Sequence, residues 1–415
     1  MGNCNCCAGT DDADDGKSSP LMDPASECDT STTVTGSEFV TDEYESPPTW
    51  STTTSANSLT DSADFERAAS TTETAQRFRP ADMTRCTGGF RESNKLDEGT
   101  FGCVFRGSLD DGTAVAIKVL KISKLLRDRK RAGRTPPGSQ SYTGEASFLR
   151  EAEVLSAFRH PNIVALLGHS VGNLAEVVSR FRAGDGDGVV LADMPCLVYE
   201  FMEGQSLKRR LRAREELDVV SRLNIASDVA RGLTFLHTKA RPPIVHQDIK
   251  TDNILLGFEG PRLVAKLADF GTVRMDQALE KHSHVSTRTV VGTTPYMPPE
   301  RYQEGHVSVK TDSFAFGVVL LELLTGLPPK SKQTKEPLCS ELGAELEEPE
   351  RLLVPYLDKR AGDWDITIAC TVAAVARRLL AWRARDRCTV VEAKPEIDRL
   401  AGRRVRKKRT PPVEH

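Results

Sequence analysis

The spacing of apolar residues changes along the chain from a strand-like to a helical pattern. Residues 90–120 alternate short apolar runs with a glycine turn and an Asp-Gly pair, which predicts three strands joined by tight turns. Residues 145–159 carry apolar side chains at helical spacing, and strand-like runs follow at 163–171 and 196–202. This part of the chain predicts a small β-rich lobe with one main helix, over about residues 86–202.

Beyond Ser206 the pattern becomes helical. Helical spacing extends over 207–238, and apolar helices are predicted again at 313–326 and 366–384. Strands grouped before helices are typical of an α+β protein. We therefore expect a second, larger lobe of helices over about 203–400, which completes a domain of residues 86–400.

Three stretches fit neither pattern. Residues 122–143 are basic and then rich in Pro and Gly, which predicts an exposed loop, and residues 171–193 form a polar, glycine-rich insertion. Residues 1–85 are rich in Ser, Thr, Asp and Glu, with 15 acidic against two basic residues among the first 75. Such a segment buries too little apolar surface to offset the entropy of ordering. We expect a disordered acidic tether whose hydroxyls are open to phosphorylation.

Composition narrows the class of protein. Of the 415 residues, 39% are hydrophobic and 28% charged, and the net charge of −3 argues against a polycation that binds nucleic acid. Ten cysteines without regular spacing favour reduced thiols in a cytosolic protein. No apolar run reaches the roughly 18 residues that a membrane span needs, and the start of the chain lacks the pattern of a secretory signal.

The two ends of the chain carry possible membrane signals. In the opening MGNCNCC, Gly2 is a candidate for myristoylation and Cys4, Cys6 and Cys7 for palmitoylation, although Cys6 stands where the motif prefers Ser or Thr. Because one myristoyl chain binds a membrane only marginally, a second acyl chain would matter. The alternative is an unmodified or metal-binding cysteine-rich tail.

The basic tail, residues 401–415, has three interpretations: a solvated end, contact with anionic lipid, or a nuclear import signal. An acylated N-terminus would slightly favour contact of the basic tail with anionic lipid over nuclear import. We therefore expect a cytoplasmic protein that is peripheral to the inner face of the plasma membrane.

The candidate chemistry is concentrated in residues 246–271, HQDIKTDNILLGFEGPRLVAKLADFG. Asp248, Lys250 and Asn253 fall on one irregular loop, and Asp269 follows a second strand-like run. Phosphoryl transfer needs this set: a carboxylate that orients and deprotonates a hydroxyl, an amide and a carboxylate that hold magnesium, and a lysine that steadies the phosphoryl group. The stretch resembles the catalytic loop and DFG motif of the eukaryotic protein kinases. The resemblance implies a bilobal kinase fold that uses ATP and Mg²⁺.

The glycine turn corresponds, in this resemblance, to the loop that covers the ATP phosphates. Gly99 and Gly102 are present, but Asp97 stands where the first glycine is usual, and a carboxylate near phosphate is repulsive. Lys118 lies in an otherwise apolar strand and needs an anionic partner. Glu151 is the candidate, with Glu153 as the alternative, so that Lys118 holds the α- and β-phosphates.

The resemblance also implies the rest of the nucleotide site. Tyr199 stands where kinases keep the residue that gates the rear pocket. The adenine would lie between apolar strand residues and would contact the main chain of the segment that joins the lobes. By resemblance these residues are Leu96, Val104, Ala116, Leu255, Glu200 and Met202.

Three structural roles follow from the same resemblance. Thr293 is expected to contact Asp248 and Lys250, Glu300 to pair with Arg387, and Asp312 to anchor the main chain of the catalytic loop. Gln247 replaces the arginine that pairs with an activation-loop phosphate, so a single loop phosphate is not expected to be an obligate switch. Candidate phosphosites there are Ser283, Ser286, Thr287 and Thr289.

GTTPYMPPE, Tyr199 and the run CLVYEFMEGQSL together resemble the tyrosine-kinase-like branch. Within it the similarity is to the interleukin-1-receptor-associated, Pelle and plant receptor-like cytoplasmic kinases. With Lys250 two residues after the base, as in Ser/Thr kinases, the expected function is transfer of the ATP γ-phosphate to Ser or Thr of protein substrates in signalling. The first alternative is a pseudokinase scaffold, which Asp97 and Gln247 favour. A small-molecule phosphotransferase is the second.

Overall fold

The computed structural model describes residues 75–99, 102–121, 144–172, 191, 193–213, 217–240, 243–275, 285–286 and 292–402. Predictions for the tether before residue 75, the basic loop 122–143, most of the insertion 171–193 and the tail beyond 402 lie outside these residues. Among the helices that are described, none combines the length and the apolar character that crossing a bilayer requires.

The first lobe is built on a six-stranded sheet with the order β1-β5-β6-β4-β3-β2. In β4 the side chains of Val115, Ile117 and Val119 are fully buried while those between them are partly exposed, the alternation expected of a strand with one face on the core. The pairs β2–β3, β3–β4, β4–β6 and β5–β6 are antiparallel, and β1 runs parallel to β5. The strands are β1 (Gln76–Phe78), β2 (Lys95–Glu98), β3 (Gly102–Ser108), β4 (Ala114–Leu120), β5 (Leu166–Ser170) and β6 (Cys196–Glu200).

Ordered structure begins earlier than the sequence predicts. Strand β1 and helix α2 (Pro80–Cys86) lie within residues 1–85, which were expected to be disordered throughout. Phe78 and Met83 are buried in the core, and β1 pairs with β5, which lies about ninety residues later in the chain. The expectation is therefore wrong for residues 76–85. Two buried side chains are too few to leave a periodic pattern in the sequence, and pairing with a distant strand leaves none either.

Helix α4 (Gly144–Ala157) joins the sheet to the rest of the domain. It contacts β4 and β5, and it also packs on the turn η3 (Phe270–Thr272) that follows the second strand of the catalytic region. Phe148 and Ala152 are buried on its inner side. The position of α4 therefore fixes Glu151 relative to both the sheet and this turn.

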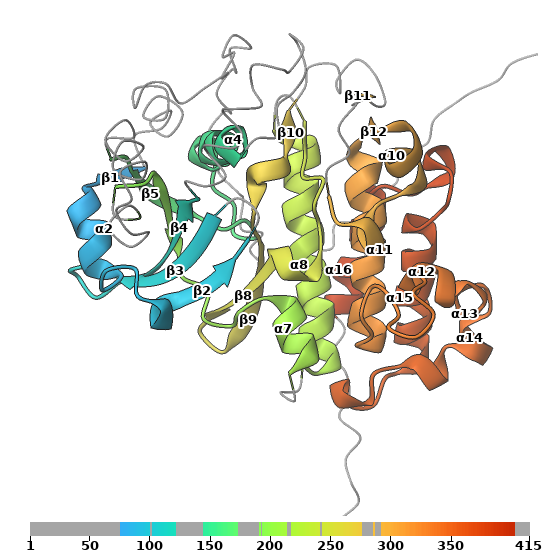
Figure 1. The fold of residues 1–415 in the computed structure, drawn as a ribbon. Coiled ribbons are helices and arrows are strands. Elements are labelled where there is room, and N and C mark those ends of the chain that lie inside the picture. Colours follow the sequence, from blue (N-terminus) through green and yellow to red (C-terminus); the bar gives the residue numbers. More distant parts are fainter. Residues whose placement is uncertain are drawn as a thin grey trace, which may run out of the picture. The chain divides into compact units, whose positions relative to one another are not determined.

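The second lobe is helical, as predicted, and is centred on α11 (Val309–Thr325). Almost all of α11 is buried, and it packs against α8 (Val219–Thr238), α15 (Ile366–Leu379) and α16 (Val390–Gly402). Figure 1 shows these helices on one side of the β8–β9 hairpin and the six-stranded sheet on the other. The other helices are α7 (Leu207–Arg212), α10 (Pro299–Glu304), α12 (Leu338–Glu341), α13 (Gly343–Glu347) and α14 (Pro349–Leu352).

Residues 207–238, which the sequence pattern predicts as helical, form two helices. Helix α7 ends at Arg212, and α8 begins after Asp218, whose carboxylate accepts a hydrogen bond from the Ser221 N–H at 2.8 Å. An aspartate in this position satisfies an N–H group that has no partner within the helix. The break leaves α7 as a separate short helix beside the catalytic loop.

Three short antiparallel strand pairs of the second lobe surround the catalytic region. They are β8 (Ile254–Glu259) with β9 (Arg262–Leu267), β7 (Ile244–Val245) with β10 (Arg274–Met275), and β11 (Val285–Ser286) with β12 (His306–Val307). The first pair corresponds to the two strand-like runs of residues 246–271. The second pair ties the start of the catalytic loop to the segment after Asp269.

Candidate active site

Helix α11 anchors the main chain of the catalytic loop through Asp312. The main-chain N–H groups of His246 and Gln247 donate to the two carboxylate oxygens of Asp312, each at 2.8 Å, and Asp312 is buried. His237 Nε2 lies 2.9 Å from the same carboxylate. The anchoring role expected of Asp312 is confirmed, and the loop is tied to the most buried helix of the domain.

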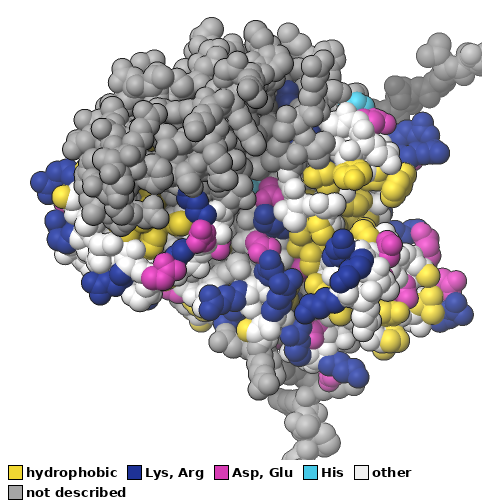
Figure 2. Space-filling view, in the orientation of Figure 1, with side chains coloured by type: hydrophobic (Ala, Val, Ile, Leu, Met, Phe, Trp, Pro, Cys, Tyr) yellow, Lys and Arg dark blue, Asp and Glu magenta, His cyan; other side chains and the backbone are white. Residues whose placement is uncertain are grey.

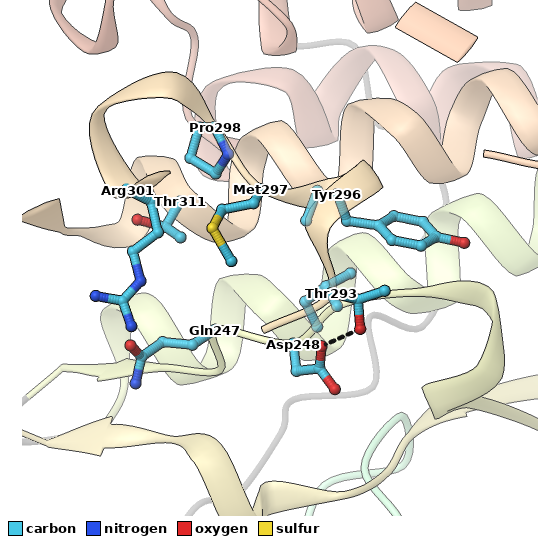
Figure 3. Close-up of a pocket in the computed structure, with 10 residues that line it drawn as sticks. Gln247, Asp248, Thr293, Tyr296, Met297, Pro298, Arg301 and Thr311 are labelled. Atoms are coloured by element: carbon cyan, nitrogen blue, oxygen red, sulfur yellow. Dashed lines mark hydrogen bonds between the residues drawn. The ribbon is translucent and has the colours of Figure 1, made fainter. Parts of the chain in front are cut away.

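Asp248 lies at the centre of a hydrogen-bonded group. Lys250 Nζ is 2.6 Å from Asp248 Oδ2, and the Thr293 hydroxyl donates to Asp248 Oδ1 at 2.8 Å. Lys250 Nζ also donates to Thr293 Oγ1 at 3.0 Å. Figure 3 shows Thr293 bonded to Asp248, with Gln247 and Arg301 lining the same small cavity. The contacts expected of Thr293 are therefore present.

Asn253 closes the loop on Asp248. Its Nδ2 donates to the Asp248 carbonyl at 2.8 Å and to Asp248 Oδ2 at 3.1 Å, and its own carbonyl accepts from the Ala268 N–H at 2.9 Å. Because Nδ2 is engaged, Oδ1 is the side-chain atom that can bind a cation. The Ala268 hydrogen bond places the next residue, Asp269, beside this group.

Asp269, Lys118 and Glu151 converge from three separate segments. Lys118 on β4 reaches Glu151 Oε2 on α4 at 2.6 Å and Asp269 Oδ1 at 2.9 Å. The Lys118 side chain is 14% exposed and that of Glu151 2%, so these charges are largely removed from water. The partner predicted for Lys118 is Glu151, and the structure makes that contact.

The charges in this group shift one another's pKa values. Burial opposes the charged form of Lys118, but Asp269 and Glu151 outweigh it, so the pKa of Lys118 is raised. Burial likewise opposes ionisation of Asp269, but Lys118 outweighs it and the pKa of Asp269 is lowered. Burial raises the pKa of Glu151 despite its contact with Lys118. Asp269 is therefore held as a carboxylate beside a charged lysine.

The main chain at Asp269 has a left-handed conformation, with φ +63° and ψ +70°. This region is uncommon for residues other than glycine and is concentrated at functional sites. The next residue, Phe270, is fully buried and its ring meets that of His246 edge to face, with centroids 4.9 Å apart. Packing of Phe270 thus holds Asp269 in the unusual conformation.

The donor set of Asn253 and Asp269 suits Mg²⁺. Both offer hard oxygen atoms, and Lys118 engages only Oδ1 of Asp269, which leaves Oδ2. Magnesium is usually held by one or two protein oxygens and completes its coordination with phosphate oxygens and water. The residues present therefore fit the metal that a bound nucleotide would bring.

The glycine turn is anchored by a lysine that the sequence did not single out. The Gly99 N–H donates to the Gly102 carbonyl at 2.9 Å, and Lys121 Nζ donates to the Gly99 carbonyl at 3.0 Å and to Glu98 Oε1 at 2.6 Å. A Cβ on Gly102 would lie 2.4 Å from the Val119 carbonyl oxygen, so close packing of β3 on β4 also requires glycine there. Asp97 is exposed on β2.

The residues expected around the adenine come from several strands of both lobes. Ala116 and Val104 on β4 and β3, and Leu255 on β8, are partly buried. Leu96 on β2 is 43% exposed and Met202 is 9% exposed. The segment that joins the lobes is bonded to β8, because the Gly204 N–H donates to the Leu256 carbonyl at 2.8 Å.

The side chain of Glu200 has a structural partner. It accepts hydrogen bonds from Lys266 Nζ at 2.9 Å and from the Ala165 N–H at 2.8 Å. Only its main chain is thus available for a nucleotide. Tyr199 beside it is buried, and burial together with the nearby Glu151 carboxylate raises the pKa of its hydroxyl.

Gln247 is buried at the position where an arginine was expected. Its Nε2 donates to the Thr272 carbonyl at 2.5 Å, just after the Asp-Phe-Gly triplet, and its own φ is +68°. The glutamine therefore ties the catalytic loop directly to the start of the activation segment. The candidate phosphosites 283, 287 and 289, and the side chain of Ser286, lie outside the described residues.

A buried polar group that the sequence analysis missed supports the end of the activation segment. Glu322 on α11 accepts from the Tyr296 hydroxyl at 2.6 Å and from Thr251 Oγ1 at 3.2 Å. Burial raises the pKa of Glu322 to about 7. In the sequence, this group was indicated by a single glutamate within the apolar run VVLLELLTG.

The pair expected between Glu300 and Arg387 is present. Two hydrogen bonds of 2.5 and 3.1 Å join the guanidinium and the carboxylate, and Arg387 is 2% exposed. This pair links α10 to the segment before α16. It stabilises the end of the activation segment and takes no part in the chemistry.

Comparison with known proteins agrees with this geometry. The family model described as protein kinase domain matches residues 90–396. The proline-rich receptor-like protein kinases PERK8 and PERK2 of Arabidopsis thaliana are 36% and 37% identical to the chain over 266 and 254 residues, or 64% and 61% of its length. The receptor-like serine/threonine-protein kinase ALE2 of the same plant is 34% identical over 305 residues, or 72% of the chain.

These matches cover 33%, 30% and 35% of the three relatives, so the chain spans about a third of the length of the curated relatives it matches. The match to the family model extends over far more than half of the chain, from the glycine turn to the last helix. The chain belongs to the protein kinase family, and the relatives that it matches are plant receptor-like kinases.

Proposed function

We propose that the protein is a catalytically competent serine/threonine kinase that phosphorylates other proteins in intracellular signalling. The observation that carries the proposal is the convergence of Lys118, Glu151 and Asp269 beside the Asp248–Lys250–Thr293 group. A pseudokinase has no need to keep both groups, since the first serves the nucleotide and the second serves the hydroxyl that receives the phosphoryl group.

The residues take the following roles in this proposal. Lys118, fixed by Glu151, holds the nucleotide phosphates, and Asn253 and Asp269 hold Mg²⁺, which would neutralise charge on the phosphates. Asp248 accepts the proton of the substrate hydroxyl. Lys250, already 2.6 Å from Asp248, steadies the transferring phosphoryl group.

Specificity for Ser or Thr is supported by the contact of Thr293 with Lys250 and Asp248. This contact fills the space beside the base with a short hydroxyl side chain from the activation segment. The relative ALE2 is named a receptor-like serine/threonine-protein kinase, and this name supports the same specificity.

The test is phosphotransfer from Mg-ATP to a degenerate Ser/Thr/Tyr peptide library by the full-length protein and by Asp248→Ala. General-base catalysis contributes about 10²- to 10⁴-fold, so the variant should lose transfer by at least two orders of magnitude. Asp363→Ala, on an exposed aspartate away from the loop, is the matched control and should keep wild-type activity. Equal activity of wild type and Asp248→Ala contradicts the assigned base, and transfer mainly to Tyr contradicts the specificity.

A pseudokinase scaffold is the second candidate, because Asp97 replaces a glycine of the phosphate loop and Gln247 replaces a cation. Thermal unfolding with and without Mg-ATP separates the two. A nucleotide that stabilises the protein, together with no transfer to any library peptide or to the protein itself, would favour the scaffold.

Membrane attachment through acylated Gly2 and a cysteine at position 4, 6 or 7 is a further part of this proposal, supported by the sequence MGNCNCC alone. Fractionation of cells that express wild type or Gly2→Ala tests it. The wild type should be enriched with membranes and the variant should be displaced from them. An unchanged distribution contradicts acylation.

A further inference from the structure

An open groove lies beside the catalytic loop, next to the segment that joins the lobes, where Ser206 pairs with Leu255 in an isolated antiparallel bridge. It has a volume of about 490 Å³ and is lined by Ser206, Lys208, Arg209, Arg212, Ala213 and Asp252. Three of these residues belong to α7 and two flank it, whereas Asp252 belongs to the catalytic loop, four residues beyond Asp248. The groove therefore adjoins the position where a substrate hydroxyl would meet the base.

The groove is strongly basic. Three of its six lining residues are cations and one is an anion. Lys208 Nζ lies 2.6 Å from Asp252 Oδ1, so the single carboxylate of the groove is already paired within the protein. Arg209 and Arg212 are exposed, and the ion pairs of the described residues include neither of them. Figure 2 shows Lys and Arg side chains gathered on the surface in the region of α7.

The internal pairing decides which substrates the groove suits. A free carboxylate beside the catalytic loop would attract a basic peptide, but Asp252 is neutralised by Lys208, and the remaining charge is positive. Arg209 and Arg212 extend into water from a helix whose Leu207 and Leu211 are buried, so the backbone that carries them is fixed. Guanidinium groups on a fixed backbone are well suited to carboxylates and phosphates.

We propose that this groove, the α7 groove, binds the acidic residues that flank the target Ser or Thr of a protein substrate. The inference rests on the proposed kinase function and adds the substrate class to it. The chain itself contains sequence of this kind, such as GSEFVTDEYESPP at residues 36–48, which has four acidic and no basic residues and three hydroxyls of Ser or Thr. A segment of the chain's own acidic region is thus one occupant with the required chemistry.

The experiment compares two synthetic peptides with the full-length protein and Mg-ATP. One has the sequence of residues 36–48, and in the other the four acidic residues are replaced by their amides, as Glu38→Gln, Asp42→Asn, Glu43→Gln and Glu45→Gln. Opposite charges raise association rates by roughly 10-fold or more, so kcat/KM should favour the acidic peptide by about that factor at low salt. The preference should shrink as the ionic strength rises.

Reversing the charges of the two groove arginines tests whether they recognise the acidic residues of the peptide. The double variant Arg209→Glu with Arg212→Glu should lower the ratio of kcat/KM for the acidic peptide to that for the neutral peptide to about one or below. The control, Arg383→Glu with Arg399→Glu, makes the same change of charge at exposed arginines that do not line the groove, and should keep the wild-type ratio. An equal ratio in the wild type and the groove variant overturns the proposal.

A binding measurement keeps the groove testable if transfer fails. A fluorescent copy of the acidic peptide, in which Ser37, Thr41 and Ser46 are replaced by Ala, should bind the wild type more tightly than the groove variant. Transfer to both peptides without a preference contradicts only the groove, whereas charge-dependent binding without any transfer contradicts only the kinase proposal.

A last measurement uses vesicles of phosphatidylserine. If the groove variant loses vesicle binding but binds the peptide as the wild type does, the groove is a lipid site and the proposal is wrong.

Discussion

Two groups of charged side chains near the catalytic loop differ in their exposure to water. On the nucleotide side, Lys118 and Glu151 are largely buried and paired across two elements, at 2.6 Å. In the α7 groove, Arg209 and Arg212 are exposed and are left out of the ion pairs of the described residues. The catalytic loop adjoins both groups, because the Asn253 carbonyl accepts from the Ala268 N–H beside Asp269 and Asp252 lines the α7 groove.

The difference between the two groups follows from the cost of removing a charge from water. A buried charge is costly unless a partner compensates for its lost hydration, so its geometry becomes fixed and its removal leaves another charge stranded. An exposed charge costs little in either state of the chain and remains available to a ligand. Buried pairs therefore position reacting groups, and exposed cations select partners.

The largest effect is expected from breaking the buried side. Lys118→Ala leaves Glu151 without its cation and facing Asp269, which should destabilise the domain by about 3–5 kcal/mol and abolish phosphotransfer. Thermal or urea unfolding measures the first effect and the peptide assay the second. Lys118→Met, which keeps the length but not the charge, separates packing from charge. Wild-type stability in both variants would mean that the pair is not buried as described.

A second prediction concerns Glu322, a buried carboxylate on α11. Its pKa is raised by burial from an ordinary value of 4.5 to about 7, although hydrogen bonds from Tyr296 and Thr251 and the charge of Arg212 oppose this shift. A raised pKa means that the folded protein binds more protons than the unfolded chain. The contribution to stability is then complete below about pH 4.5 and is lost as the pH rises to about 7.

Glu322→Gln should remove that dependence. Over this pH range the free energy of unfolding of the wild type should fall relative to that of the variant by up to roughly 3 kcal/mol. Urea unfolding at a series of pH values measures the difference. Asp363→Asn, at an exposed position, controls for the loss of a carboxyl group. Parallel curves for wild type and Glu322→Gln contradict the raised pKa.

The smallest effect is expected at the exposed pair of the groove. The side chains of Lys208 and Asp252 are 34% and 39% exposed, so Lys208→Ala should change stability by less than about 1 kcal/mol. The same variant frees the carboxylate of Asp252 and should weaken the preference for acidic peptides. A loss of stability as large as that of Lys118→Ala would remove the contrast between the buried and the exposed charges.

Local patterns were sufficient for much of the fold and the site. Alternation in β4 and helical spacing in α4 and α11 were visible in the sequence because each element buries one face or all of its surface. Asp248, Lys250, Asn253 and Asp269 were identified by their spacing, which reflects one loop and one turn of the chain. These residues are close in sequence, so their arrangement is largely local.

Other features depended on contacts between distant segments. Strand β1 and helix α2 were expected to be disordered because their order comes from pairing with β5 and from two buried side chains. Glu322 and Lys121 gave only weak signals, since a single polar residue in an apolar run does not say which partner satisfies it. The basic run in α7 was visible, but its position beside Asp252 was not.

The sequence by itself determined the order of strands and helices, the buried faces and the identity of the groups that can bind phosphate, metal and a hydroxyl. The tertiary structure decided between Glu151 and Glu153 as the partner of Lys118, and it alone paired Lys208 with Asp252. Electrostatic interactions depend on distance and on exposure to water, and both are set by how segments far apart in the chain pack together. Lys118 is therefore fixed within a buried group, whereas Arg209 and Arg212 remain open to a partner.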